Sequence, residues 1–325
     1  MNPELRQLAD EYWEYVLRTQ PTNAHMLGDY RYVDQVEDAS REAEDAHIGH
    51  LRSFAAKARA FDPADLDAAD RVTQDTLIYE TETAAGIEEL RQAEFGIDPI
   101  FGPQAVFQVA IPQMSVETPE HAEMMLTKYS GIARLLDQLS ERLREGVRAG
   151  RVNAEFAVTK TVEQIDALLA SPVEDDVFLK AQMPAAFDES DVAAWRERAG
   201  TIVTDELRPA FGRYRDVIRD EVGPIARSNE EAGLTFVPNG DLLYVRLIEK
   251  YTTMPMQAAE IHEIGLQQID RLAEEYLELA GPLLGTTSLE DIFTALRDDP
   301  ELHLSLIHIS EPTRRATISR MPSSA

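Results

Sequence analysis

Hydrophobic residues recur at helical spacing along most of the chain. Near its start they lie three or four positions apart, at Leu5, Leu8, Tyr12 and Val16, and this predicts a helix that stops at Pro21. The same spacing predicts further helices over about 40–60, from 67 onward, from 118 to Gly146 or Gly150, and over 153–169, 190–206, 209–222, 241–251, 257–279 and 288–296. Alternation typical of a β-strand is not found over any useful length. The pattern predicts an all-α fold, a large multi-helix array.

Two segments carry more specific expectations. The helix that begins near Asp67 is expected to bury a stripe made of Val72, Leu77, Ile78, Thr81, Ala84 and Ile87. The stretch 95–117 instead mixes apolar side chains with the helix breakers Pro99, Pro103 and Pro112. Such a mixture predicts an ordered, packed loop that contains a short turn of helix.

Composition and charge narrow the function classes. The chain has 325 residues, no Cys, 59 acidic and 31 basic side chains, and a formal net charge of −28. This charge repels phosphate backbones and argues against nucleic-acid binding. The absence of Cys excludes a disulfide framework and thiolate metal ligands. No apolar run is long enough for a membrane span, and the charged start of the chain does not fit a signal peptide, so a cytoplasmic location is predicted.

The end of the sequence differs in kind from the rest. Residues 304–314 read LSLIHISEPTR and residues 319–325 read SRMPSSA. These strings resemble the translation of the two ends of a transposase-type sequencing adapter, in the correct order. We therefore expect residues 1–303 to be the N-terminal portion of a larger helical domain. Residues 304–325 are expected to be non-native, which would mean that the reading frame was cut short.

Histidines are the first candidates for chemistry. His47 and His50 are three positions apart on a predicted helix, near Glu44 and Asp45, and could hold a metal; the alternative is a half-buried helix face with solvated charges. His262 and Glu263 resemble the start of the zinc-protease motif H-E-x-x-H. Leu266 stands where that motif needs its second His, which favours a structural or hydrogen-bonding role for His262. Phosphate loops, dinucleotide fingerprints and nucleophile elbows are absent from the sequence.

Several blocks, taken in order, resemble a bacterial family called domain of unknown function 885 (DUF885). The N-terminal block is Gln20–Asp29, and the next two are Tyr129–Leu136 and Leu143–Gly150. The most specific block runs from Gly233 to Leu266 and begins Gly-Leu-Thr-Phe-Val-Pro-Asn-Gly. The likeness covers nearly all of residues 1–303.

The resemblance implies an all-helical, zinc-metallopeptidase-like protein that hydrolyses peptides. Members of the family carry an H-E-x-x-x-H-H-type motif and a further Glu toward their C-terminal end. Nothing in this chain matches that motif, so no metal ligand can be assigned here. Zinc is implied for the full-length protein only, and this fragment is expected to be inactive.

Four residues of the specific block occupy positions that match the family, and they are candidates for the substrate pocket: Tyr244, Thr252, Thr253 and His262. The alternative is that Thr252 and Thr253 cap a turn and that His262 braces a helix junction. A rival interpretation of the whole chain is a non-catalytic, all-helical binding or scaffold module that is complete without zinc.

Overall fold

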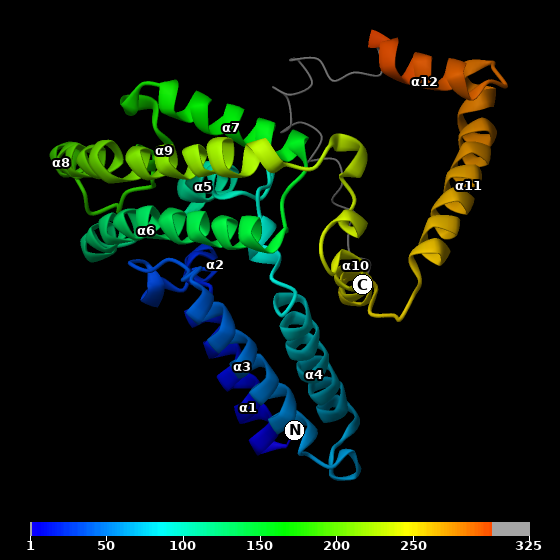
Figure 1. Ribbon diagram of the computed structural model, residues 1–325, viewed down its shortest axis with the longest axis horizontal. Coiled ribbons are helices and arrows are strands. Elements are labelled where there is room, and N and C mark those ends of the chain that lie inside the picture. Colours follow the sequence, from blue (N-terminus) through cyan, green and yellow to red (C-terminus); the bar gives the residue numbers. More distant parts are fainter. Residues whose placement is uncertain (1, 301–325) are drawn as a thin grey trace, which may run out of the picture. The chain divides into compact units, whose positions relative to one another are not determined.

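A computed structural model describes residues 2–300. These residues fall into two compact units, which divide after Pro255. Figure 1 shows the helices of both units. Within the described residues the only β-type pairings are two isolated bridges, between Ser115 and Gln182 and between Ala154 and Arg227. The predicted all-α fold is confirmed. None of the helices in residues 2–300 is long and apolar enough to cross a membrane.

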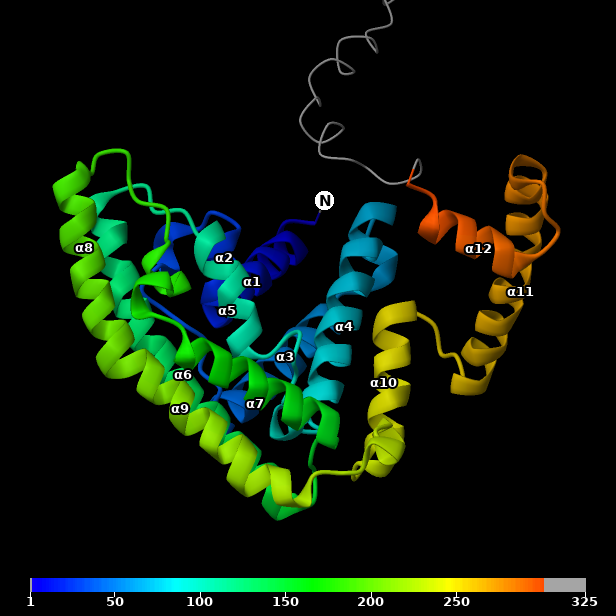
Figure 2. The ribbon, with the colours of Figure 1, turned by 90° about the horizontal axis from the view of Figure 1, so that it is seen from above.

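Three helices pack together at the beginning of the first unit: α1 (Pro3–Thr19), α3 (Arg41–Arg59) and α4 (Ala68–Glu88) (Figures 1 and 2). Their small apolar core consists of Leu8, Tyr15, Phe54, Ala58 and Leu77. The side chain of Ser40 caps α3 by accepting from the amide of Ala43, and Asp67 caps α4 in the same way. Side-chain caps of this kind satisfy amides that have no partner inside the helix, which explains why both helices begin where predicted.

The structure corrects two expectations in this region. Pro21 does not only end α1; it also occupies the first position of a short helix, α2 (Pro21–Met26), where its missing amide costs nothing. Val72 is 65% exposed and lies outside the buried stripe of α4. Gln74 is buried instead, because its Nε2 donates to the carbonyl oxygens of Ala58 and Phe61, each at 2.9 Å.

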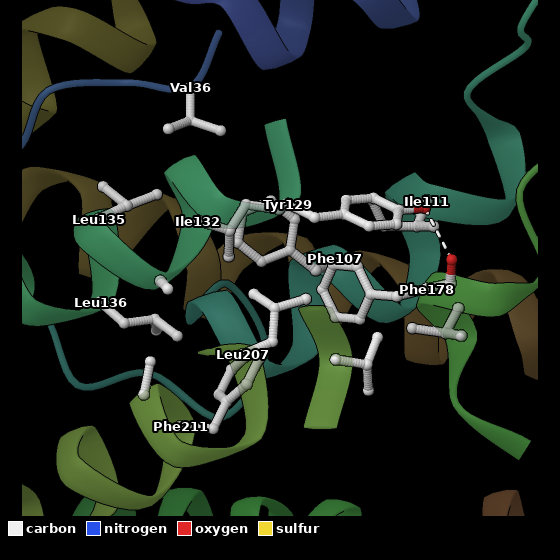
Figure 3. Close-up of a cluster of buried hydrophobic side chains, with 14 of the residues drawn as sticks. Val36, Phe107, Ile111, Tyr129, Ile132, Leu135, Leu136, Phe178, Leu207 and Phe211 are labelled. Atoms are coloured by element: carbon white, nitrogen blue, oxygen red, sulfur yellow. Dashed lines mark hydrogen bonds between the residues drawn. The ribbon is translucent and has the colours of Figure 1, made fainter. Parts of the chain in front are cut away.

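A larger core surrounds α6 (Pro119–Ala149), which contacts α8 (Glu189–Ile202) and α9 (Arg208–Asp216), while α7 (Glu155–Ala170) packs on α9. Figure 3 shows Tyr129 in its interior, where the hydroxyl donates to the carbonyl oxygen of Phe178 at 2.8 Å. That bond satisfies the one polar atom of a fully buried ring, so Tyr129 contributes apolar area at little polar cost.

The segment 95–117 was predicted to be a loop, and this prediction was wrong for its second half. There the chain forms α5 (Pro103–Gln113). Pro103 stands at the first helical position, where proline is tolerated; Pro112 lies inside the last turn, where it removes one amide donor, and the helix ends at the next residue, Gln113. Because Phe107 and Ile111 are buried in the larger core, packing outweighs the weak helix propensity of this sequence.

The predicted break at Pro209 is also absent. Residues 189–222 form one helical run in which α8 and α9 are joined by a wide π-type turn, Val203–Leu207, and a second such turn, Val217–Val222, follows α9. Pro209 comes directly after the first wide turn, where α-type hydrogen bonding is already interrupted, so the proline does not end the run.

The first unit ends with α10 (Gly240–Thr252), which packs on α4. The hydroxyl of Tyr79 in α4 donates to the carbonyl oxygen of Glu249 at 2.6 Å. The second unit contains α11 (Ala258–Leu284) and α12 (Leu289–Asp298). Helix α11 extends five residues beyond its predicted end at 279. The expected boundary at 303 and the tail 304–325 lie outside the described residues and stay predictions.

Candidate functional site

A cavity of about 890 Å³ opens beside α1 and α3 in the first unit. Its wall also includes residues from the segment 35–40 and from the end of α4. Many of its lining side chains are polar or charged, among them Tyr15, Arg18, Glu37, Asp38, His47, His50, Glu88 and Asp98. We call it the polar chamber.

A second cavity of about 510 Å³ adjoins the first. The two share wall residues, namely Gln20, Glu37, Ala39, Ala93, Gly96 and Phe101, and so lie side by side; we refer to them together as the cleft. The second cavity is bounded mainly by apolar side chains from α2, α5 and α6: Met26, Val106, Phe107, Leu135, Leu139 and Leu143. We call it the apolar chamber. Both volumes are in the range of small-molecule and peptide-binding pockets.

Three helices contribute a chain of polar contacts to the wall of the polar chamber. The hydroxyl of Tyr15 in α1 lies 2.5 Å from Nδ1 of His47 in α3. Nε2 of His47 lies 3.4 Å from a carboxylate oxygen of Glu88 in α4. When the ring proton is on Nε2, facing Glu88, Nδ1 accepts a hydrogen bond from the Tyr15 hydroxyl.

Burial, with the negative charge of Glu88 as a second cause, raises the pKa of Tyr15 to about 12. The phenol therefore keeps its proton near neutral pH and acts as a donor, not as a nucleophile. The contacts of His47 join α1, α3 and α4 at the chamber wall.

The residues that sequence spacing grouped as a metal site are not arranged as one. Both carboxylates near His47 are engaged by arginines: Glu44 pairs with Arg91 and Arg142, and Asp45 pairs with Arg91. Across residues 2–300, no three His, Asp or Glu side chains are grouped so that they could hold a metal ion.

Next to the polar chamber, Glu94 anchors a cluster of ion pairs. Its side chain is fully buried and accepts from Arg41 and from Arg151, whose Nε lies at 2.8 Å. Arg142 and Glu145 extend the cluster along α6. Because a buried carboxylate needs opposite charge and hydrogen bonds, this cluster fixes the 3₁₀ turn Gln92–Phe95, which forms part of the cleft wall.

The substrate-pocket candidates on α10 lie at its exposed face and at its end. Tyr244 is 45% exposed. Two turns later, the hydroxyl of Thr252 donates to the carbonyl oxygen of Ile248 at 2.7 Å and accepts from the amide of Met254. Thr253 follows with φ of 58°, a left-handed conformation that is unfavourable for a β-branched residue. The structure thus places the two threonines together and Tyr244 apart from them.

The fourth candidate, His262, lies on α11 in the second unit and is exposed. A capping role for Thr252 is directly visible, as its hydroxyl satisfies backbone groups at the end of α10. Thr253 is the residue that ends α10, and its amide donates to the carbonyl oxygen of Glu249 at 2.9 Å; a glycine would adopt its left-handed conformation at lower cost.

The glycine-rich block before α10 has a steric explanation. A Cβ on Gly240 would lie 1.6 Å from the carbonyl oxygen of Leu234, so only glycine fits where α10 begins against the preceding turn. Asn239, with φ of 64°, redirects the chain there. This block therefore positions α10, and Tyr244 with it.

Sequence reasoning singled out His47 but missed its partners and the cleft. Tyr15 and Glu88 come from other helices, and no spacing along the chain shows that they meet His47. The one available signal was that all three lie on predicted helices with apolar stripes, which had to pack against each other.

The first unit thus combines an all-helical fold with a cleft of two chambers, one of which is lined by several carboxylates. The model of a family described as "Bacterial protein of unknown function (DUF885)" matches residues 21–310. The chain belongs to this family, as its sequence blocks indicated. No curated protein matches it.

A solved structure supports the same fold. The chain is similar to a protein described as "the putative lipoprotein from Colwellia psychrerythraea", with a TM-score of 0.82 and 16% sequence identity. The match covers 94% of this chain and 56% of that one, so this chain spans just over half the length of that relative. At this identity the likeness shows the fold alone. The words of that description concern the relative, and a cytoplasmic location for this chain stays a prediction.

Proposed function

We propose that this chain is the N-terminal portion of a zinc-metallopeptidase-like protein that hydrolyses peptides. The observation that carries the proposal is family membership over residues 21–310, since the resemblance implies peptide hydrolysis for the full-length protein. The solved relative, of which the chain matches 56%, is compatible with a longer protein.

The described residues do not themselves fit a zinc site, as no suitable group of three ligands occurs within 2–300. We therefore derive no step of the reaction through the metal. In this proposal the metal ligands belong to the part of the full-length protein that follows residue 303. The role of this chain is to bind and position the peptide.

Helix α10 would contribute Tyr244, Thr252 and Thr253 to the substrate pocket. Two observations support this part of the proposal. Tyr244 presents a half-exposed ring that can pack on a peptide side chain. Thr253 retains a strained backbone, which is found more often at functional positions than elsewhere.

The test uses the full-length gene product. Stoichiometric bound zinc together with hydrolysis of a peptide library supports the proposal. If the full-length protein binds no zinc and hydrolyses no peptide, the proposal is contradicted. That result would favour the non-catalytic binding or scaffold module. The 325-residue chain, assayed alone, is expected to show no hydrolysis.

A substitution then tests His262. In the full-length protein, His262→Ala is expected to lower kcat/KM by about 10-fold or more without changing the melting temperature. Gln268→Ala is the matched control, because Gln268 is also an exposed polar residue of α11. Equal turnover in the two variants would remove His262 from the substrate pocket.

A further inference from the structure

We propose that the two-chambered cleft binds an extended peptide segment in which an apolar side chain fills the apolar chamber and a neighbouring lysine or arginine side chain enters the polar chamber. The inference takes only the substrate class, a peptide, from the proposed function. It goes further by locating the bound segment within the first unit and by specifying its side chains.

The apolar chamber offers a pocket for one large apolar side chain. Its walls come from three helices: Met26 at the end of α2, Val106 and Phe107 on α5, and Leu139 on α6. Val106 and Met26 are partly exposed, at 37% and 45%, so they can still lose water when a ligand packs on them. Burying such surface favours binding by an apolar group.

The polar chamber is complementary to a cation. Its wall carries five carboxylates, from Glu37, Asp38, Glu44, Glu88 and Asp98, and two guanidinium groups, from Arg18 and Arg142. Glu44 is already paired with Arg91 and Arg142, so four carboxylates remain against the guanidinium of Arg18.

Both arginines already have partners within the protein. The guanidinium of Arg142 is held by Glu44 and Glu145, and that of Arg18 lies over the ring of Tyr15, 5.4 Å from its centroid. The excess of negative charge in a partly enclosed chamber therefore attracts a basic side chain and repels an acidic one.

The cleft also presents groups that suit a peptide backbone. Gln20, Gln35 and Gln92 lie along the wall of the polar chamber with exposed side chains, and Gln20 reaches the apolar chamber as well. A carboxamide both donates and accepts, and so matches the N–H and C=O groups of a peptide bond. An apolar pocket, amide groups and an acidic pocket along one cleft favour a peptide over a simple cation.

The experiment measures binding to the 325-residue chain by isothermal titration calorimetry at low ionic strength. The probe is the terminally blocked tetrapeptide Gly-Phe-Lys-Gly, with Gly-Lys-Phe-Gly to test the other direction. The comparison peptides replace Lys by Glu or Phe by Ser. The better basic probe is expected to bind at least about 10-fold more tightly than either comparison peptide, as both chambers contribute.

Paired variants connect binding to each chamber. Val106→Asp should weaken binding of the basic probe about 10-fold, while Val109→Asp, the same change on an exposed face of α5 that does not line the cleft, should leave it unchanged. Glu88→Gln should weaken binding several-fold. Its control is Glu89→Gln, which makes the same charge change where the side chain pairs with Arg52 outside the cleft.

Equal affinity for the Lys and Glu peptides, or the same loss in a variant and its control, would overturn the inference. Failure of both basic probes to bind to the folded wild-type chain at millimolar concentration would do so too. Folding of every variant is checked by circular dichroism. These outcomes are separate from those for the proposed function, because binding here needs neither zinc nor turnover.

Discussion

The hydroxyl of Tyr15 lies 2.5 Å from Nδ1 of His47 and thereby joins α1 to α3 at the wall of the polar chamber. Tyr15→Phe keeps the ring in place but leaves the imidazole nitrogen without this donor. We expect the free energy of unfolding to fall by about 1 kcal/mol, as for the loss of one hydrogen bond. Urea denaturation followed by far-ultraviolet circular dichroism measures this change.

Tyr12→Phe is the control for that experiment. Tyr12 precedes Tyr15 on the same helix and packs its ring against Phe54, but within residues 2–300 its hydroxyl makes no hydrogen bond. Its loss should change stability by less than about 0.5 kcal/mol. Equal effects of the two substitutions would show that the Tyr15–His47 contact does not contribute to stability.

The buried carboxylate of Glu94 is expected to matter far more than a surface carboxylate. Glu94→Gln removes the negative charge that Arg41 and Arg151 share. Arg151 then loses its carboxylate partner, while Arg41 keeps its pairs with Glu44 and Glu145. The expected loss is about 3–5 kcal/mol. In Glu89→Gln the affected pair, with Arg52, is nearly half exposed on both sides, and the expected loss is about 0–1 kcal/mol. Chemical denaturation of both variants checks the difference, and losses of equal size would contradict it.

Gly146 is sterically required at the point where α6 passes the Glu94 turn. A Cβ there would lie 2.0 Å from the carbonyl oxygen of Glu94 and 2.7 Å from that of Arg151. Since both are backbone atoms, neither can move aside cheaply, and Gly146→Ala should destabilise the protein by about 3 kcal/mol.

Gly200 provides the opposite case within another helix. An added Cβ on Gly200 would meet no neighbouring atom within 4 Å. Gly200→Ala should therefore stabilise the protein by about 0.5–1 kcal/mol, because alanine loses less backbone entropy on folding. The melting temperatures of Gly146→Ala and Gly200→Ala should shift in opposite directions. A shift in the same direction would show that helix propensity, and not the room for a Cβ, determines the effect at both positions.

Lys128 should make stability depend on pH in the mildly alkaline range. Burial lowers the pKa of Lys128 to about 8, against the opposing influence of Glu37 and Asp34, and its ammonium donates to the carbonyl oxygen of Gln35. An unfolded lysine stays protonated to about pH 10. Between about pH 8 and 9.5 the unfolded chain therefore binds more protons than the folded one, and stability rises with pH.

The expected rise over that interval is at most about 2 kcal/mol. Lys128→Met should abolish it, because methionine fills a similar volume and does not titrate. Urea denaturation at both pH values, in both proteins, isolates the contribution of this side chain from other groups that titrate in the same interval. The same pH dependence in both proteins would show that Lys128 is not its source.

Local sequence signals predicted the fold well wherever one helix determines its own limits. Ser40, Asp67 and Thr118 cap helices at the expected positions, and Gly150 ends α6 in a left-handed conformation. The predictions failed where tertiary packing determines whether a segment is helical or which residue is buried. Phe107 and Ile111 draw a proline-containing segment into a helix, and Gln74 replaces Val72 as a buried residue because it meets two carbonyl groups from a neighbouring helix end.

The cleft could not be predicted from the sequence, for the same reason. The packing of three helices brings together Tyr15, His47 and Glu88. Their spacing in the sequence does not indicate that they are in contact. The α10 candidates could be named only through the family resemblance, and their role stays a prediction.

The two wide turns in residues 189–222 are positions at which this chain can lose a residue from its sequence and keep its packing. Buried residues from Trp195 through Val203 and Phe211 to Val222 stay on one face of the run. In a regular α-helix of that length the buried stripe would rotate progressively around the helix axis, away from α6. Each wide turn accommodates an extra residue and so offsets part of that rotation. Each is therefore a natural point for the loss of a single amino acid during evolution. Removing one there converts a wide turn into an ordinary one, whereas a deletion in the middle of α6 would rotate everything that follows.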